Sequence, residues 1–161
     1  MPLVLDGNGD ITGLVAGALP SNVIGAGAVL QVVQGVTTTE TLFTSGSYAD
    51  AITVSITPSS SSNKILLVTS IFGQANGTTT TGALRLTRDS TAIATWVEWV
   101  RSANYGGGTA QMTASLNYLD SPATTSAITY RLQVARTGGS DNCFYPVSSS
   151  PTIIIAMEIA G

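Results

Sequence analysis

Apolar and polar residues alternate along most of the chain with a period of two. In AITVSIT this pattern places Ile52, Val54 and Ile56 on one face, and AQMTASLNYL and ITYRLQVAR repeat it further along the chain. Such alternation is typical of β-strands that bury one face. No stretch long enough for a stable helix has the helical period, so we predict an all-β protein of about eight to ten short strands separated by Gly-, Ser- and Pro-rich turns.

Two segments are apolar at consecutive positions instead of alternate ones. These segments are KILLVTSIF and PTIIIAMEI, the second of which closes the chain. Strands that are buried on both faces have this composition. We therefore expect both segments to be central strands covered on each side.

The segment GALRLTRDSTAIATW predicts a β-hairpin. Leu84 and Leu86 would face the core, the turn would fall at Arg-Asp-Ser-Thr, and Ile93 would lie on the returning strand. WVEW follows as a further short strand, on which alternation places Trp96 and Trp99 on opposite faces. One indole would enter the core, and the other would lie at a subunit contact or in a sugar-stacking site.

The beginning of the chain differs from the rest. Residues 1–29 are rich in glycine, and their apolar residues follow no stable period. Such a segment can hardly bury a core of its own. We predict an extended N-terminal arm over residues 1–29 and a head over residues 30–161. The head is expected to be an antiparallel β-sandwich of jelly-roll type, with a lectin-like or immunoglobulin-like sandwich as the alternative.

The arm contains LDGNGDITGL, which begins in the manner of a calcium loop. Asp6, Asn8 and Asp10 stand at alternate positions, but a helix–loop–helix calcium site also needs Gly at its sixth position and Glu at its twelfth. Ile11 and Gly17 occupy those two places. We therefore expect no metal there, but two short extended pieces, PLVL and DITGLV, joined by an Asp-Gly-Asn-Gly turn.

The chain carries very little charge. Six Lys and Arg and nine Asp and Glu make up 9% of the residues, against roughly 25% in an ordinary globular protein. Mean hydropathy is +0.32 and 43% of the residues are apolar. Because so few charges leave large neutral areas of surface, we expect sister subunits to cover part of that surface in an obligate oligomer.

Composition argues against several function classes. The chain contains no histidine and has a pI of about 4.5, so a histidine base, a histidine metal site and a basic surface for nucleic acid are all missing. The longest apolar runs are too short to span a membrane, and the N-terminus has no signal-peptide pattern. The single cysteine, Cys143, is expected to be a small buried residue. Glu98 lacks a second acid nearby, so we predict no enzymatic activity, no cofactor and no metal.

A run of phrases gives the chain a resemblance to a known group of proteins. LQVVQ, ITPSSSSNKILLVTS, LRLTRDSTAI, YLDSPATTSAITYRLQ and TIIIAMEIAG occur in this order. Together they resemble bacteriophage virion surface proteins of the capsid-decoration, head-fibre and tail-fibre-like kinds, over about residues 28–161. The start, MPLVLDGNGDITGL, is similar to the N-terminal segment of such chains. The resemblance implies a homotrimer of jelly-roll heads, similar in plan to tumour-necrosis-factor and C1q-like heads, with Leu66, Val68, Phe72 and Ile154 at the trimer interface.

The leading hypothesis is a non-enzymatic structural protein of a phage virion, a trimeric capsid decoration (cement) protein. The segment before the head contains no heptads or repeats that would form the shaft of a fibre. We expect the arm to attach the head to the major capsid protein or another virion protein. The protein would be made in the bacterial cytoplasm and located on the virion surface. The residues expected to make the attachment are Leu3, Leu5, Ile11, Leu14 and Leu19.

Two other functions fit the sequence. The first is a tail-fibre or spike tip that binds a bacterial surface glycan through Trp99 and Tyr105 and the loops at 101–109 and 137–142. The second is a secreted lectin-like protein unrelated to phage. Exposure of the two aromatic side chains on an outward end of the head would favour the first of these.

Overall fold

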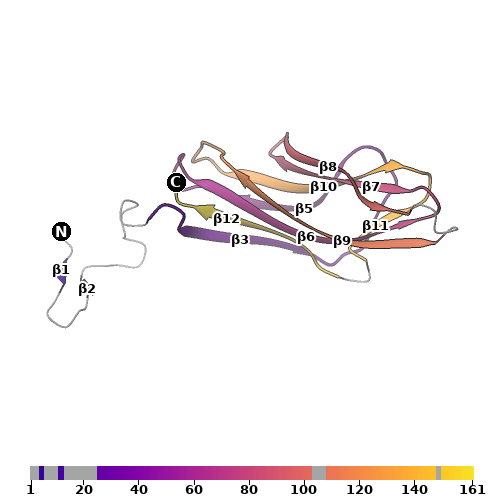
Figure 1. Cartoon of the computed structure of the whole chain (residues 1–161). Helices are drawn as coiled ribbons and strands as arrows, with labels where there is room; N and C mark the ends of the chain where they lie inside the picture. The colour runs from indigo at the N-terminus through magenta and orange to yellow at the C-terminus, as the bar shows by residue number, and fades with distance from the viewer. Residues whose placement is uncertain (1–3, 6–10, 13–24, 103–107, 148–149) are drawn as a thin grey trace.

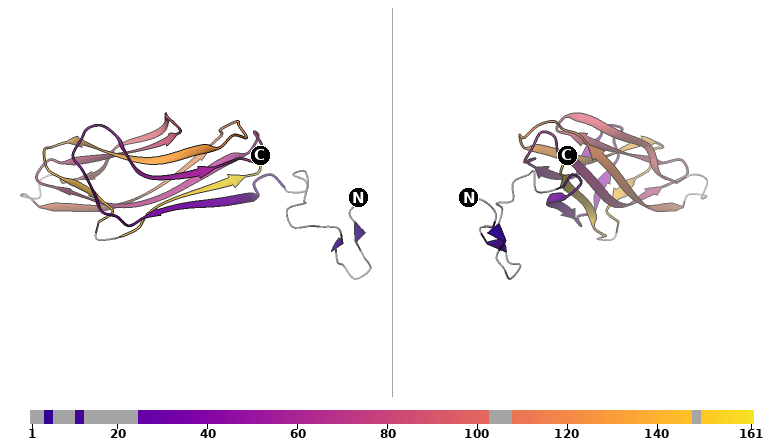
Figure 2. Two further views of the ribbon diagram at one scale, coloured as in Figure 1. Left: turned by 180° about the vertical axis from the view of Figure 1, so that it is seen from behind. Right: turned by 60° about the vertical axis from the view of Figure 1, so that its left-hand side comes forward.

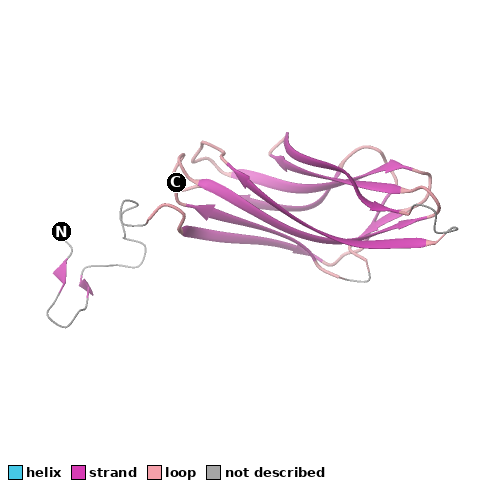
Figure 3. Cartoon of the chain, viewed as in Figure 1, coloured by secondary structure: helices cyan, strands magenta, loops and turns pink. Residues whose placement is uncertain are grey.

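The computed structural model describes residues 4–5, 11–12, 25–102, 108–147 and 150–161, and strands connected by turns make up the described chain (Figures 1 and 3). All pairings between strands are antiparallel, as the alternation predicted. The strands are β1 (Val4–Leu5), β2 (Ile11–Thr12), β3 (Val29–Thr37), β4 (Thr41–Phe43), β5 (Ala49–Ile56), β6 (Lys64–Asn76), β7 (Thr81–Arg88), β8 (Thr91–Arg101), β9 (Thr109–Asp120), β10 (Ile128–Gly138), β11 (Cys143–Tyr145) and β12 (Thr152–Ile159).

Two sheets pack face to face as an elongated sandwich (Figures 1 and 2). One sheet has the strand order β5-β10-β7-β8. In the other sheet, one side of β6 pairs with β9. The other side of β6 pairs with β12 and, further along, with β11. β12 in turn pairs with β3, and β11 pairs with β4. The eight long strands therefore have the orders β3-β12-β6-β9 and β5-β10-β7-β8, which is the double Greek key of a jelly roll.

The core lies between the sheets and is built by the predicted alternation. Along β6 every second side chain, beginning with Ile65 and Leu67, is buried. Ile52, Val54 and Ile56 are buried together in the opposite sheet, and so are Leu84 and Leu86 of the predicted hairpin. Each strand thus contributes one apolar face, and the two inner faces together exclude water from the core.

The two sheets approach each other closely where β3 passes β5. A Cβ atom on Gly35 of β3 would lie 2.5 Å from the backbone oxygen of Thr53 in β5. Only a residue without a side chain allows this approach. The sandwich is therefore closed along its β3–β5 side.

The prediction that Trp96 and Trp99 lie on opposite faces of a strand is wrong. Between the pairs Gly82–Val100 and Leu84–Trp96, the β7–β8 register shifts because β8 contains extra residues. A bulge of this kind breaks the alternation of side chains. As a result Trp99 is buried in the core, and Trp96 is half-buried and packs against the same core.

The N-terminal segment is described only in part. Val4 and Leu5 of β1 pair with Thr12 and Ile11 of β2, in agreement with two short extended pieces, and the predicted turn between them lies outside the described residues. Leu3, Leu14 and Leu19 lie outside the described residues, as does Tyr105.

The chain joins the sandwich beside its own C-terminus. The Gly27 amide donates a hydrogen bond to the Ala160 carbonyl at 2.8 Å, and the Ala160 amide donates to the Ala28 carbonyl at 2.9 Å. Figure 1 shows the C-terminus at the end of the sandwich where β3 begins. The described sandwich therefore begins at this end, at residue 25.

Candidate interaction surface

The outer face of the sheet that contains β6 is apolar. On β6 and β12 the side chains between the buried ones point away from the core, and they are half-buried by their neighbours in the sheet. Edge strands add side chains that are far more exposed, such as Val32 at 58% and Leu119 at 51%. We call this surface the outer apolar face, and it comprises Val32, Val36, Leu66, Val68, Phe72, Leu119, Ile153, Ile155 and Met157.

Strand register places these side chains directly beside one another. Met157 stands opposite Val32 on one side and Leu66 on the other, and Leu66 stands opposite Leu119. This row of four apolar residues crosses four strands. The next row continues the patch through Ile155 and Val68. Side chains directly opposite one another in a sheet are in contact distance, so the patch is continuous.

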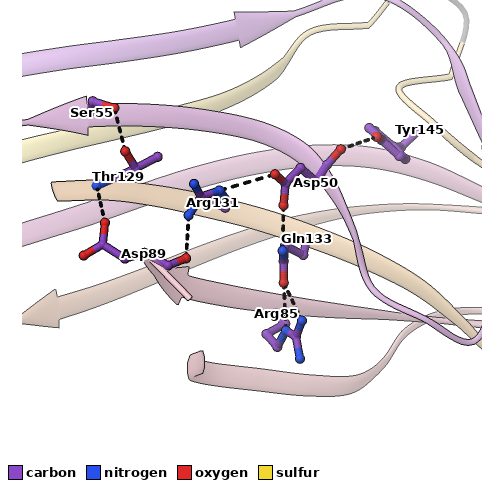
Figure 4. A network of polar contacts seen from close by, with 8 residues as sticks. All are labelled: Asp50, Ser55, Arg85, Asp89, Thr129, Arg131, Gln133 and Tyr145. Atoms are coloured by element: carbon purple, nitrogen blue, oxygen red, sulfur yellow. Dashed lines mark hydrogen bonds and ion pairs between the residues drawn. The ribbon is translucent and has the colours of Figure 1, made fainter. Parts of the chain in front are cut away.

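The two outer faces of the sandwich differ in polarity. Uncharged polar side chains such as Gln34, Ser70 and Asn117 lie within the outer apolar face, and Lys64 stands at its end on β6. By contrast, the outer face of the β5-β10-β7-β8 sheet carries a charged network (Figure 4). Water hydrates that face at no cost, whereas the outer apolar face is more stable when it is covered.

The charged network links three strands across the polar face. Arg131 Nε lies 3.3 Å from Asp50 Oδ2, and Gln133 Nε2 donates to Asp50 Oδ1 at 2.6 Å. Arg85 donates to Gln133 Oε1 from Nε at 2.9 Å and from Nη2 at 2.6 Å. The Arg85 guanidinium also lies 4.0 Å from the centre of the Tyr48 ring. These groups satisfy one another, so this face needs no partner.

Three of the four side chains expected at a trimer interface lie on the outer apolar face, and the fourth does not. Leu66, Val68 and Phe72 alternate along β6 and point away from the core. Ile154 is 0% exposed in the core of a single chain and has no surface to offer to another copy. Because PTIIIAMEI is apolar at consecutive positions, its sequence does not show which residues face outward. The strand register gives that role to Ile153 and Ile155.

Sequence reasoning missed the edges of this face. Val32, Val36 and Leu119 were not singled out, although the alternation in LQVVQGV already puts Val32 and Val36 on one face of the strand. That alternation defines two faces of a strand but does not say which of them meets the core. The pairing of β3 with β12 decides it.

Trp99 does not offer an aromatic platform for a glycan. Its side chain is 6% exposed and its ring packs over Gly73 of β6. Its Nε1 has no hydrogen-bond partner within the described part of the chain. A buried indole cannot stack on a sugar in solvent, so this expected receptor contact is corrected.

Comparisons with known proteins give structural likenesses alone. No protein-family model and no curated protein matches the sequence. Among solved structures, VP2 of the infectious bursal disease virus subviral particle is 13% identical, with a TM-score of 0.42 over 80% of this chain and 38% of that one. The infectious bursal disease virus Gx strain structure gives 12% identity and a TM-score of 0.41 over 83% and 39%.

A third structure, the T13 particle of the same virus, is 11% identical, with a TM-score of 0.37 over 80% of this chain and 37% of that one. The chain therefore spans less than two thirds of the length of each of these proteins. At such TM-scores the likeness carries no argument about function, and the proposal below depends on the surface of the sandwich.

A buried carboxylate lies at the end of the sandwich where the chain enters. Glu158 is 1% exposed and accepts hydrogen bonds from Asn63 Nδ2 at 2.6 Å and Gln31 Nε2 at 2.6 Å. The Ser59 amide and hydroxyl donate to it at 2.6 and 2.8 Å. Burial alone would raise the pKa of Glu158, but these hydrogen bonds outweigh burial and lower it. Neutral donors thus keep the Glu158 carboxylate ionised, and its hydrogen bonds hold neighbouring parts of the fold together.

A second polar tie connects the two sheets. Asp120 at the end of β9 lies 3.0 Å from Arg88 Nη1, and Tyr130 Oη donates to Asp120 Oδ2 at 2.6 Å. Burial, followed by the hydrogen bond and charge of Asp120, raises the pKa of Tyr130 well above its usual range. The phenol therefore remains a proton donor, and the contact holds β9 against β7 and β10.

The chain has a single thiol, and it lies in the described part of the structure. Cys143 is buried beside the core, and burial raises the pKa of its thiol to about 11, which keeps it protonated. Among the described residues no group of three or more His, Cys, Asp or Glu is arranged to hold a metal ion. The same residues include no helix with the length and apolar character of a membrane span.

Proposed function

We propose that this chain is a non-enzymatic structural protein of a bacteriophage virion, and specifically a trimeric decoration protein on the capsid surface. The observation that carries the proposal is the outer apolar face, because an isolated chain would leave this continuous patch in water. The assignment to a phage virion and the number of three subunits come from the resemblance of the sequence to virion surface proteins.

In the proposed trimer, three copies cover their outer apolar faces around a threefold axis. Transferring a fully exposed Val or Leu side chain out of water contributes about 1.5–3 kcal/mol, and Val32, Val36 and Leu119 are each about half exposed. Several such contributions per chain can exceed the cost of ordering a subunit. The polar face around Asp50 and Arg131 would then point toward solvent.

The N-terminal arm would attach the trimer to the particle. Its apolar residues Leu3, Leu5, Ile11, Leu14 and Leu19 are the proposed contacts with the major capsid protein or another virion protein. Three arms leaving one trimer make this attachment multivalent, so weak individual contacts add up to a tight attachment. The glycan-binding fibre tip is the less favoured function, because its aromatic platform included the buried Trp99.

The first test places a charge on the outer apolar face. We expect Val68→Glu to abolish the trimer, since a carboxylate in the middle of the patch must lose its hydration when the patch is covered. Mass photometry of the purified chain at micromolar concentration measures the change. If Val68→Glu does not fold, Val32→Glu replaces it, because Val32 is a much more exposed position of the same face.

The matched control is Thr95→Glu, at an exposed position of β8 opposite Arg85. It should leave the trimer intact. A native chain that is monomeric throughout the micromolar range, or a trimer that survives both substitutions on the outer apolar face, would contradict the proposal.

A further inference from the structure

The outermost strand of the larger sheet, β9, has an open edge. Among the described residues it pairs with β6 alone. The edge is about 40 Å long at the usual rise per residue. Backbone groups along an unpaired edge of this length are a template for another strand.

The other sheet edges carry features that block strand addition. The pairing of β8 with β7 has two register shifts, and exposed Glu98 and Arg101 form an ion pair near its end. On the opposite side of the sandwich, β3 packs closely on β5 through Gly35. Bulges, charges and cover of this kind are the usual protection of edge strands.

β9 has no register shift and no opposed charges along its edge, although part of it lies close to β8 of the other sheet. Its pairing with β6 runs from Asp120–Ile65 to Thr109–Asn76 without a register shift. Its sequence, TAQMTASLNYLD, contains no Pro, Lys, Arg or Glu. Its one charged residue, Asp120, is buried and held by Arg88. Apolar side chains near both ends also remain in water, since Met112 is 47% and Leu119 is 51% exposed.

We propose that β9 pairs antiparallel with β9 of a second copy across a twofold axis. A twofold axis makes two identical strands antiparallel, and each copy presents the same row of backbone donors and acceptors. A pairing centred on Ser115 sets Met112 opposite Tyr118 and Ala114 opposite Leu116, so that large side chains meet smaller ones and no charges oppose each other.

A second copy is the occupant that the geometry favours over a foreign strand. A β9–β9 contact uses the open edges of both copies at once, so it closes and does not grow into a fibre. The contact uses the backbone edge of β9, whereas the outer apolar face is a surface of side chains. The two share Leu119 at the end of β9, and the contact does not depend on the proposed virion function. Where the chain is also trimeric, the twofold contact links one trimer to the next.

The test is a charge exchange at Ser115, an exposed position at the centre of β9. We expect Ser115→Lys and Ser115→Glu each to abolish the twofold contact, because two like charges would stand opposite each other. Mixing the two variants in equal amounts should restore it. Mass photometry and native mass spectrometry distinguish the mixed pair from pairs of one variant, and Thr95→Lys on β8 is the matched control.

The background of Val68→Glu separates this inference from the proposed trimer. In that background we expect a dimer, and adding Ser115→Lys should halve the mass to that of a monomer. A Val68→Glu chain that is already monomeric at every concentration overturns the β9 contact and leaves the trimer proposal standing. If Val68→Glu remains a trimer, the outer apolar face is not the trimer interface. The mixing experiment with the two Ser115 variants then still tests the β9 contact.

Discussion

Gly73 lies on β6 directly beneath the indole of Trp99. A Cβ atom at this position would lie 1.8 Å from Trp99 Cη2 and 2.5 Å from Cζ2. Because the ring is flat and its neighbours are packed, it cannot move aside without opening the core. The absence of one side chain on β6 therefore allows a tryptophan from β8, in the other sheet, to enter the sandwich.

We predict that Gly73→Ala lowers the free energy of unfolding by about 1–3 kcal/mol, the usual cost of overpacking a core. Urea unfolding followed by tryptophan fluorescence measures it, and the emission should shift to the red as Trp99 becomes exposed to water. Gly46→Ala is the control, because its Cβ would meet only the Arg136 carbonyl at 3.6 Å. Equal stabilities of Gly73→Ala and the native chain would show that Trp99 does not pack on Gly73.

At the scale of elements, Glu158 ties three parts of the fold together. Its carboxylate, on β12, accepts hydrogen bonds from Gln31 of β3 and from Ser59 and Asn63 of the loop after β5. Asn63 in turn accepts a hydrogen bond from the Gly161 amide at 3.1 Å. One ionised group thus orders the end of the sandwich at which the chain enters and leaves.

This arrangement predicts a dependence of stability on pH. The pKa of Glu158 is lower in the folded chain than its ordinary value of 4.5, so the folded state favours the ionised carboxylate. Its contribution is complete above the unfolded pKa and is lost as the pH falls through the lower folded pKa. Thermal melts between pH 6 and about pH 3 should show this loss in the native chain.

Glu158→Gln should remove that part of the pH dependence and lower the free energy of unfolding at neutral pH by about 1–3 kcal/mol, because an amide group would face the donors of Asn63 and Ser59. Glu98→Gln is the control, since its ion pair with Arg101 is exposed and contributes little. Parallel melting curves for native chain and Glu158→Gln across this pH range would refute the assignment.

For the whole molecule, the described sandwich begins at residue 25. Its core and the hydrogen bonds of Gly27 and Ala28 to Ala160 involve residues after that point. If the arm serves attachment alone, the head can fold and assemble without it.

We predict that a chain lacking residues 1–24 keeps its thermal midpoint and its oligomeric mass but no longer binds to capsids. Co-sedimentation with undecorated particles measures the binding, and the full-length chain is the positive control. Truncated heads that sediment with particles as well as full-length chains would show that attachment lies elsewhere on the head.

The apolar–polar alternation of the sequence predicts the buried side chains at some positions and not at others. Alternation correctly placed Ile52, Leu84 and Leu86 in the core, because β7 carries no extra residue and β5 is regular from Ile52 onward. It failed at Trp99, where a register shift lies between the paired residues, and at Ile154, where neighbouring residues are all apolar. Neither a long-range register nor a bulge leaves a local mark in the sequence.

The sequence by itself determined the all-β class, the strand segments and the scarcity of charge, because these follow from local periodicity and composition. Only the tertiary structure decided which sheet each strand joins and therefore which apolar residues meet in the core and which form the outer apolar face. It also decided that β9 stands at an open edge. These properties depend on pairings between residues far apart in the chain, and one residue of register turns every side chain of a strand to the other face.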